Sequence, residues 1–141
     1  MEAHELNHVS FLVIQSAIEV HRTLGPGLLE SIYRPCLIYE LQDRGLNVTA
    51  EQYVPLSYKG LVFDGVYRLD VLVENVVVVE LKCVEAIIPV HLAQLRSYLR
   101  LAEKPLGLLI NFNVPVLVEG VERVMNGAFE AALHSKGTKT P

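Results

Sequence analysis

Three ionisable residues interrupt a strongly apolar stretch of this chain. In the segment YRLDVLVENVVVVELK, Tyr67 to Lys82, Asp70 stands inside one apolar run, and Glu80 and Lys82 end the next. Continuous apolar runs are typical of strands buried on both faces, where an unpaired charge is costly. The three groups therefore indicate a pocket, a metal site or a mutual ion pair.

The alternation of side chains along a strand brings these residues together. Glu80 and Lys82 project to the same face of the valine strand. If the strand that contains Asp70 pairs with it as a hairpin turning at Glu74-Asn75, Asp70 lies near Glu80. Two carboxylates and a lysine are the minimum for metal-assisted hydrolysis of a phosphodiester, because carboxylates hold a divalent ion and lysine neutralises developing charge. A buried Glu-Lys ion pair is the plainer alternative.

Composition predicts one soluble domain. The chain has 141 residues, of which 51% are hydrophobic, enough for one core. We expect a single domain over residues 1–134 and a flexible polar tail over residues 135–141. No apolar run approaches the roughly 20 residues of a membrane span, and no leader pattern is present, so we expect a cytoplasmic protein without membrane partners.

Cysteine content and net charge argue against several classes of protein. Cys36 and Cys83 are too few for a disulfide framework or an all-cysteine zinc site, and we expect both to be reduced core residues. The net charge of -4 argues against coating nucleic acid by bulk charge, but it leaves room for a local site where a metal neutralises carboxylates.

Hydrophobic periodicity and turn residues predict the elements that must position the three ionisable residues. The predicted helices are Leu6–Leu24, Leu28–Arg44, Pro89–Ala102 and Gly127–His134. The predicted strands are Val48–Tyr58, Leu61–Val73 as one or two strands interrupted near Gly65, Val76–Cys83, Leu106–Phe112 and a short one at Val116–Val118. Pro35 predicts a kink or a later start in the second helix.

The order of these elements predicts the architecture. The first strands form antiparallel pairs, and the helix Pro89–Ala102 carries the chain from the valine strand to a parallel neighbour, Leu106–Phe112. Helices then cover both faces of a mixed central sheet. The predicted fold is an α/β protein, a three-layer α/β/α sandwich.

Several short motifs together resemble a known family. The string LGPGLLESIY, Leu24 to Tyr33, contains Gly27-x-x-Glu30-x-x-Tyr33. With Asp70, Glu80-x-Lys82 and the segment HLAQLRSYL, it resembles the GxxExxY proteins of the PD-(D/E)XK nuclease superfamily over roughly Leu6 to Val124. The sequence departs from the usual pattern at Pro35, and at Leu69 where a proline conventionally precedes the aspartate.

The resemblance implies a restriction-endonuclease-like core with Mg²⁺ or Mn²⁺ as cofactor and DNA or RNA as partner. Gln94-x-x-x-Tyr98 is similar to the element that follows the lysine strand in RecB-like nucleases. The implied catalytic residues are Glu30, Asp70, Glu80, Lys82 and Gln94, of which Asp70, Glu80 and Glu30 hold the metal. The expected substrate-positioning residues are Tyr98, His91, Arg96 and Arg100.

Each of these residues also has a structural interpretation. Glu30 can complement the positive end of its helix. His91 can be a satisfied helix histidine, and Arg96 and Arg100 can belong to a solvated helix face rather than a stripe that tracks phosphates. Tyr33 reads as a core aromatic.

Two other functions remain open. The first is a non-catalytic homodimer that uses the same fold to bind nucleic acid or protein. The second is a zinc hydrolase, because HELNH matches His4-Glu5-x-x-His8, with two histidines one helical turn apart. The extended zinc motif is absent, since Phe11 and Ile14 stand where its glycine and third histidine belong.

Overall fold

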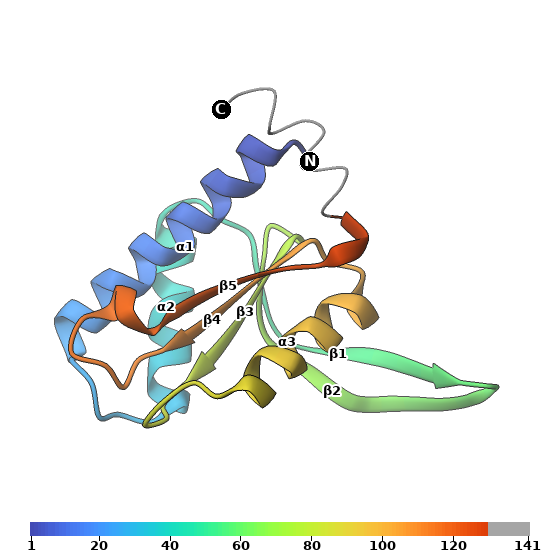
Figure 1. Cartoon of the computed structure of the whole chain (residues 1–141). Helices are drawn as coiled ribbons and strands as arrows, with labels where there is room; N and C mark the ends of the chain where they lie inside the picture. The colour runs from blue at the N-terminus through green and yellow to red at the C-terminus, as the bar shows by residue number, and fades with distance from the viewer. Residues whose placement is uncertain (130–141) are drawn as a thin grey trace.

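A mixed sheet lies between two layers of helices. The structure, a computed structural model, describes residues 1–129 without the side chain of Val66. Within these residues the helices are α1 (Ala3–Leu24), α2 (Glu30–Asp43), α3 (Pro89–Ala102) and the 3₁₀ turn η1 (Leu117–Gly120). The strands are β1 (Val48–Tyr58), β2 (Leu61–Val73), β3 (Val77–Lys82), β4 (Leu106–Asn111) and β5 (Val121–Met125), and they lie in the order β1-β2-β3-β4-β5 (Figure 1).

The strand directions confirm the predicted mixed sheet. β1 pairs with β2, and β2 with β3, in antiparallel fashion. β3 and β4 are parallel and are connected through α3, because parallel neighbours need a crossover. β5 returns antiparallel to β4.

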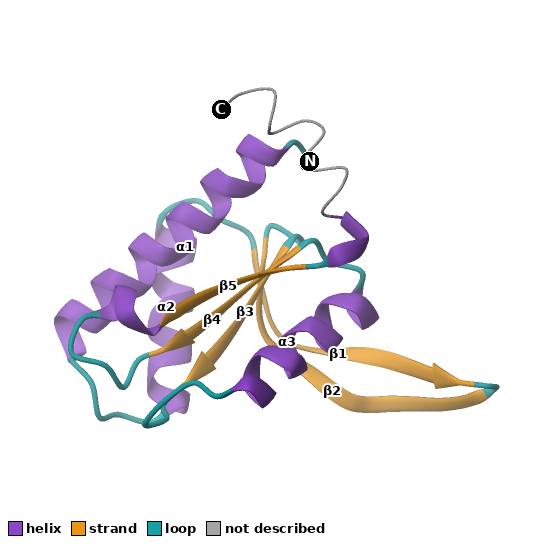
Figure 2. Cartoon of the chain, viewed as in Figure 1, coloured by secondary structure: helices purple, strands orange, loops and turns teal. Residues whose placement is uncertain are grey.

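The core has two parts, one on each face of the sheet. α1 and α2 pack on the face that presents Val77, Val79 and Leu81. α3 packs on the opposite face, against Val78 and Leu109 (Figure 2). β3 is therefore covered on both sides, as its valine run predicts, and the three-layer α/β/α sandwich is confirmed.

Both hairpin turns use backbone conformations that favour tight antiparallel connections. Lys59 and Gly60, between β1 and β2, have φ of 46° and 90°. Glu74 and Asn75, between β2 and β3, have φ of 52° and 59°. Two successive positive φ values are typical of the type I′ turn, whose twist matches that of the flanking strands. The predicted turns at both places are confirmed.

The outer part of the β1–β2 hairpin extends away from the sandwich (Figure 1). We call residues 55–66 the arm. Leu61, Val62 and Phe63 are exposed within it, as is Tyr58. β2 is one continuous strand rather than two, and its pairing with β1 shifts register between Val54 and Leu56, close to Gly65.

Three details differ from the sequence prediction. The strand predicted at Val116–Val118 is wrong: η1 begins at Leu117, and the strand that completes the sheet is β5, which the sequence analysis missed. α2 begins at Glu30 rather than Leu28 and contains Pro35 in its interior. Of the predicted helix Gly127–His134, residues 127–129 are helical, while its remainder and the predicted tail 135–141 lie outside the described residues.

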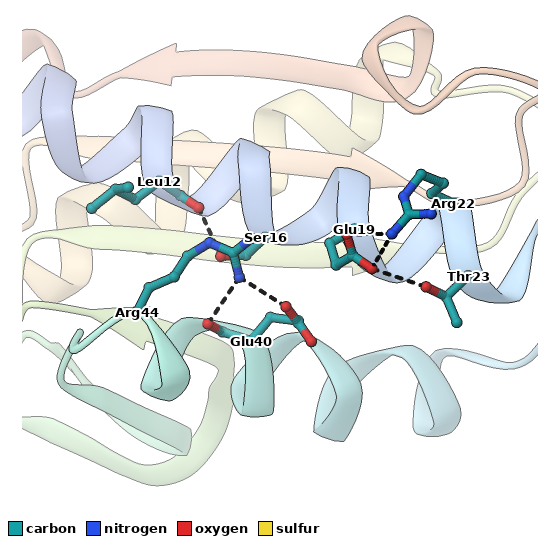
Figure 3. A network of polar contacts seen from close by, with 7 residues as sticks. All are labelled: Leu12, Ser16, Glu19, Arg22, Thr23, Glu40 and Arg44. Atoms are coloured by element: carbon teal, nitrogen blue, oxygen red, sulfur yellow. Dashed lines mark hydrogen bonds and ion pairs between the residues drawn. The ribbon is translucent and has the colours of Figure 1, made fainter.

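Polar contacts on α1 and α2 line the outer side of the helical layer (Figure 3). Arg22 donates two hydrogen bonds to Glu19, at 2.7 and 2.6 Å, and Arg44 donates to Glu40 Oε1 at 2.8 Å. Beside them a groove of about 300 Å³ is lined by Glu19, Val20, Thr23, Leu24, Pro35, Cys36, Tyr39 and Glu40. None of these residues belongs to the predicted site. Within residues 1–129, no helix combines the length and apolar character needed to cross a bilayer.

Candidate active site

The pairing of β2 with β3 ends one step before Asp70 and Glu80. The last paired residues are Val71 and Val79, so Asp70 and Glu80 are next across the two strands. At this point hydrogen bonds from backbone N–H groups to side-chain carboxylates take the place of backbone–backbone hydrogen bonds. The Asp70 N–H donates to Glu80 Oε1 at 3.4 Å, and the Leu81 N–H donates to Asp70 Oδ2 at 3.0 Å. The predicted proximity of the two carboxyl groups is confirmed, and we call them the acid pair.

Glu80 is buried and Asp70 is partly buried, so charge on Glu80 is costly. Glu80 is only 7% exposed. Burial, and next the charge of Asp70, raise the pKa of Glu80 to about 9, while the charge of Lys82 acts in the opposite direction. Lys82 is half-buried on the same strand, two residues further on. The predicted trio of Asp70, Glu80 and Lys82 therefore forms one electrostatic unit.

An arginine from α2 completes this unit. Arg34 Nη2 lies 3.2 Å from Asp70 Oδ1, and the two side chains are 17% and 14% exposed. Both carboxylate oxygens of Asp70 are thus engaged, one by Arg34 and the other by the Leu81 N–H. The sequence analysis missed Arg34. The available signal was its spacing, because Arg34 is four residues after Glu30 and such residues share a helix face.

A backbone irregularity in β1 places another carboxylate near Arg34. Glu51 has a φ of 54°, and the β1–β2 pairing passes from Ala50 to Gln52 without including it, opposite Asp70. Glu51 Oε1 lies 3.8 Å from Arg34 Nη1 and 3.8 Å from Arg68 Nη2. The sequence analysis missed Glu51.

α3 brings one of its predicted residues to the acid pair. The Tyr98 ring lies 5.2 Å from that of Tyr67. Burial, followed by the charges of Glu80, Tyr67 and Asp70, raises the pKa of Tyr98, so its hydroxyl lies within the field of the acid pair. Gln94 is exposed one helical turn before Tyr98.

The other α3 residues have local partners. His91 Nδ1 accepts a hydrogen bond from the Ile88 N–H at 3.1 Å, which caps the start of the helix. Arg100 donates to Ser97 Oγ at 3.2 Å, and Arg96 is exposed. Among residues 1–129, no hydrogen bond or ion pair joins these three to the acid pair. Their substrate-positioning role stays a prediction.

The Gly27-x-x-Glu30-x-x-Tyr33 motif has a structural basis. Tyr33 is fully buried and stacks on Phe112 at 4.4 Å. Its hydroxyl donates to the Gly25 carbonyl at 2.5 Å and accepts from the Leu28 N–H at 3.1 Å, which ties down the loop that leads into α2. This loop holds Glu30 in the first turn of the helix, near enough to Cys83 that, after burial, its charge raises the pKa of that thiol. The prediction of Tyr33 as a core aromatic is confirmed.

Cys83 and Cys36 are partly buried beside the core rather than inside it. Both are free thiols that pack against the core layer beneath α1 and α2. Cys83 therefore points away from the face that carries Lys82.

The residues after Lys82 are held by a buried amide. Asn111 pairs with Lys82 across β3 and β4 and is 2% exposed. Its side chain accepts from the Val84 N–H at 3.1 Å and donates to the Val84 carbonyl at 2.9 Å. Asn111 therefore fixes the direction in which the chain leaves the candidate site, a role that the sequence analysis missed.

The donor set of the acid pair fits a hard divalent cation. Two carboxyl groups lie in contact, and each raises the energy of the other's charged form, which a cation between them would relieve. Within the described part of the chain, however, no group of three or more His, Cys, Asp or Glu side chains is arranged to hold a metal. Asp70 and Glu80 can supply two ligands and water the others, as Mg²⁺ sites commonly do.

The zinc alternative gains no ligand from the fold. His4 and His8 are exposed near the start of α1. Over residues 1–129, no third histidine, cysteine or carboxylate joins them in a metal-binding group.

Comparisons with known proteins identify a family and a structure of similar fold. The family model described as the PD-(D/E)XK nuclease superfamily matches residues 7–124. A solved structure described as "Crystal structure of SSO0001" is similar to this chain at 21% identity with a TM-score of 0.54, a likeness that shows the fold alone. The match covers 78% of this chain and 56% of that one, so this chain spans little more than half of its length. No curated protein matches.

Proposed function

Since this chain belongs to the PD-(D/E)XK nuclease superfamily, we propose that it hydrolyses phosphodiester bonds of DNA or RNA and that it needs Mg²⁺ or Mn²⁺ to do so. The observation that carries the proposal is the buried contact between Asp70 and Glu80 beside Lys82. We place the protein in the cytoplasm, where free thiols such as Cys36 and Cys83 stay reduced.

Each residue of the trio has a distinct task in this proposal. Asp70 and Glu80 would hold the metal, which supplies an activated water and stabilises charge on the phosphate. Lys82 presents an ammonium group beside Glu80, where it neutralises charge that develops on the phosphate oxygens and orients the attacking water. We assign Glu30 to the outer part of the metal shell, through water.

The helix α3 supplies the substrate contacts. Tyr98 lies within the field of the acid pair and Gln94 is exposed one turn away, so both can reach a nucleic-acid strand bound there. His91, Arg96 and Arg100 extend this surface along the helix. An aromatic ring offers a stacking platform and arginines attract phosphate, independently of base sequence.

The test is cleavage of labelled single- and double-stranded DNA and RNA in Mg²⁺ or Mn²⁺, with EDTA as a control. We expect Lys82→Ala to lose at least about 100-fold in rate, since it removes a charge that acts in the transition state. Lys104→Ala is the matched control. Lys104 Nζ donates a hydrogen bond to Asn75 Oδ1 at 3.0 Å, and this pair does not include the trio. Folded protein that cleaves none of these substrates would contradict the proposal.

A second candidate is a homodimer that binds nucleic acid or protein without catalysis. The exposed apolar side chains of the arm favour it, since such patches commonly mark interaction surfaces. Sedimentation of the full chain distinguishes the two: stable self-association together with absent cleavage would support this candidate over the nuclease.

A further inference from the structure

Arg34 is a cation in direct contact with Asp70, one member of the acid pair. It approaches Asp70 Oδ1 from α2 at 3.2 Å, and both side chains are mostly buried. The guanidinium therefore places a positive charge against one carboxyl group of the acid pair. The charge of Arg34 therefore supplies part of the neutralisation that a bound divalent ion would supply.

The bonding of Arg34 is incomplete in this arrangement. A guanidinium carries five N–H donors. Its Nε is buried and has no hydrogen-bond partner among the described residues, and its Nη1 is 3.8 Å from Glu51 Oε1, too far for a hydrogen bond. A buried donor without a partner is costly, so the observed position does not satisfy every donor of Arg34, and Glu51 offers it a second carboxylate within 3.8 Å.

We propose that Arg34 is a positioning residue that acts as the counter-cation of the acid pair in the metal-free protein, and that it releases Asp70 to a divalent ion and turns toward Glu51. The inference rests on the proposed function, because it assumes that Asp70 and Glu80 bind metal. Arg34 and the metal compete, because both are cations and both use the carboxylate of Asp70.

The competition predicts an unusual direction of change. Removing a residue from a binding site normally weakens binding. Here, removing the charge of Arg34 removes a cation that repels the metal, so the metal binds more tightly. We expect about a tenfold lower Kd for Mn²⁺, after allowance for screening by solvent and salt.

The experiment is calorimetric titration of the full chain with Mn²⁺ in the absence of nucleic acid. Arg34→Gln removes the charge and keeps a hydrogen-bond donor for Asp70, whereas Arg34→Lys keeps the charge. Arg68→Gln is the matched control, because Arg68 shares the Glu51 contact at 3.8 Å and, in the described part of the chain, forms no ion pair with Asp70. We expect Arg34→Gln to bind about tenfold more tightly than wild type, Arg34→Lys to bind like wild type, and Arg68→Gln to change less than Arg34→Gln.

Thermal unfolding separates this role from a purely structural one. We expect Arg34→Gln to lower the Tm in EDTA and excess Mn²⁺ to restore it, so that Mn²⁺ raises the Tm of the variant more than that of wild type. An equal loss of Tm with and without Mn²⁺ would overturn the inference. If Arg34→Gln does not fold, Arg34→Met is the second uncharged variant, with the same expected result.

Two outcomes of the titration would count against the proposal in different ways. If wild type binds Mn²⁺ and folded Arg34→Gln binds it equally or more weakly, the counter-cation role is wrong and metal dependence stands. If neither protein binds Mn²⁺, the metal part of the proposed function fails as well.

Discussion

Replacing Glu80 with glutamine should stabilise the metal-free protein, and increasingly so as pH rises. Glu80 has a pKa of about 9 in the fold, against an ordinary value of 4.5, chiefly because of burial and then the charge of Asp70. Between these two values the folded state binds a proton that the unfolded state has released. The free energy of unfolding of wild type therefore falls as pH rises through this window.

The size of the effect follows from the same two values. Each pH unit between them lowers the free energy of unfolding by up to about 1.4 kcal/mol. At pH 7, the penalty reaches about 3 kcal/mol as an upper limit, because the acid pair can relax. Glu80→Gln has no such proton to lose, and an amide oxygen can still accept from the Asp70 N–H.

The assay is urea unfolding in EDTA at several pH values from 5 to 9. We expect the stability advantage of Glu80→Gln over wild type to grow steadily across this range. Glu122→Gln, an exposed glutamate on β5, is the control for loss of one negative charge. An advantage that stays constant with pH would refute the reasoning that Glu80 is buried as a neutral acid.

Two further predictions concern the same site and the loop beside it. Mn²⁺ binding by wild type should tighten up to about tenfold per pH unit between pH 6 and 8, because the metal must displace the proton of Glu80; titration calorimetry measures it, and a flat profile would contradict it. Tyr33→Phe should lower the free energy of unfolding by about 1–3 kcal/mol, since Gly25 and Leu28 each lose a hydrogen-bond partner. Urea unfolding beside Tyr39→Phe, an exposed tyrosine of the same helix, tests this, and equal losses would contradict it.

The elements predicted best are those whose ends carry local signals. α3 has the predicted bounds because Pro89 suits a first helical position and the chain turns before Pro105. β1 matches its prediction to the residue, bounded by the Lys59-Gly60 turn. β5 was missed because two of its five residues are charged, and its place depends on pairing with β4, which no local pattern encodes.

The contacts of the candidate site were likewise predictable where local patterns determine them and not where packing does. The contact between Asp70 and Glu80 was predictable because strand alternation and one hairpin turn determine it. Arg34 was not, because its contact with Asp70 depends on how α2 packs over β2, which is a property of the folded core. The spacing of Arg34 from Glu30 indicates a shared helix face, but not which strand that face packs on.

The arm is structurally separate from the two core layers. The core residues nearest to it on the two strands are Val54 and Tyr67, and among the described residues none from 55 to 66 belongs to either core layer. Beyond this point β1 continues for four residues (55–58) and β2 for six (61–66), and four strand residues give a reach of roughly 13 Å. Its length can therefore change by pairs of residues, one on each strand, without altering the packing that positions the acid pair. Insertions and deletions at Lys59-Gly60 would adjust what the protein touches while leaving its fold intact, and this turn is a natural position for a probe that reports on bound partners.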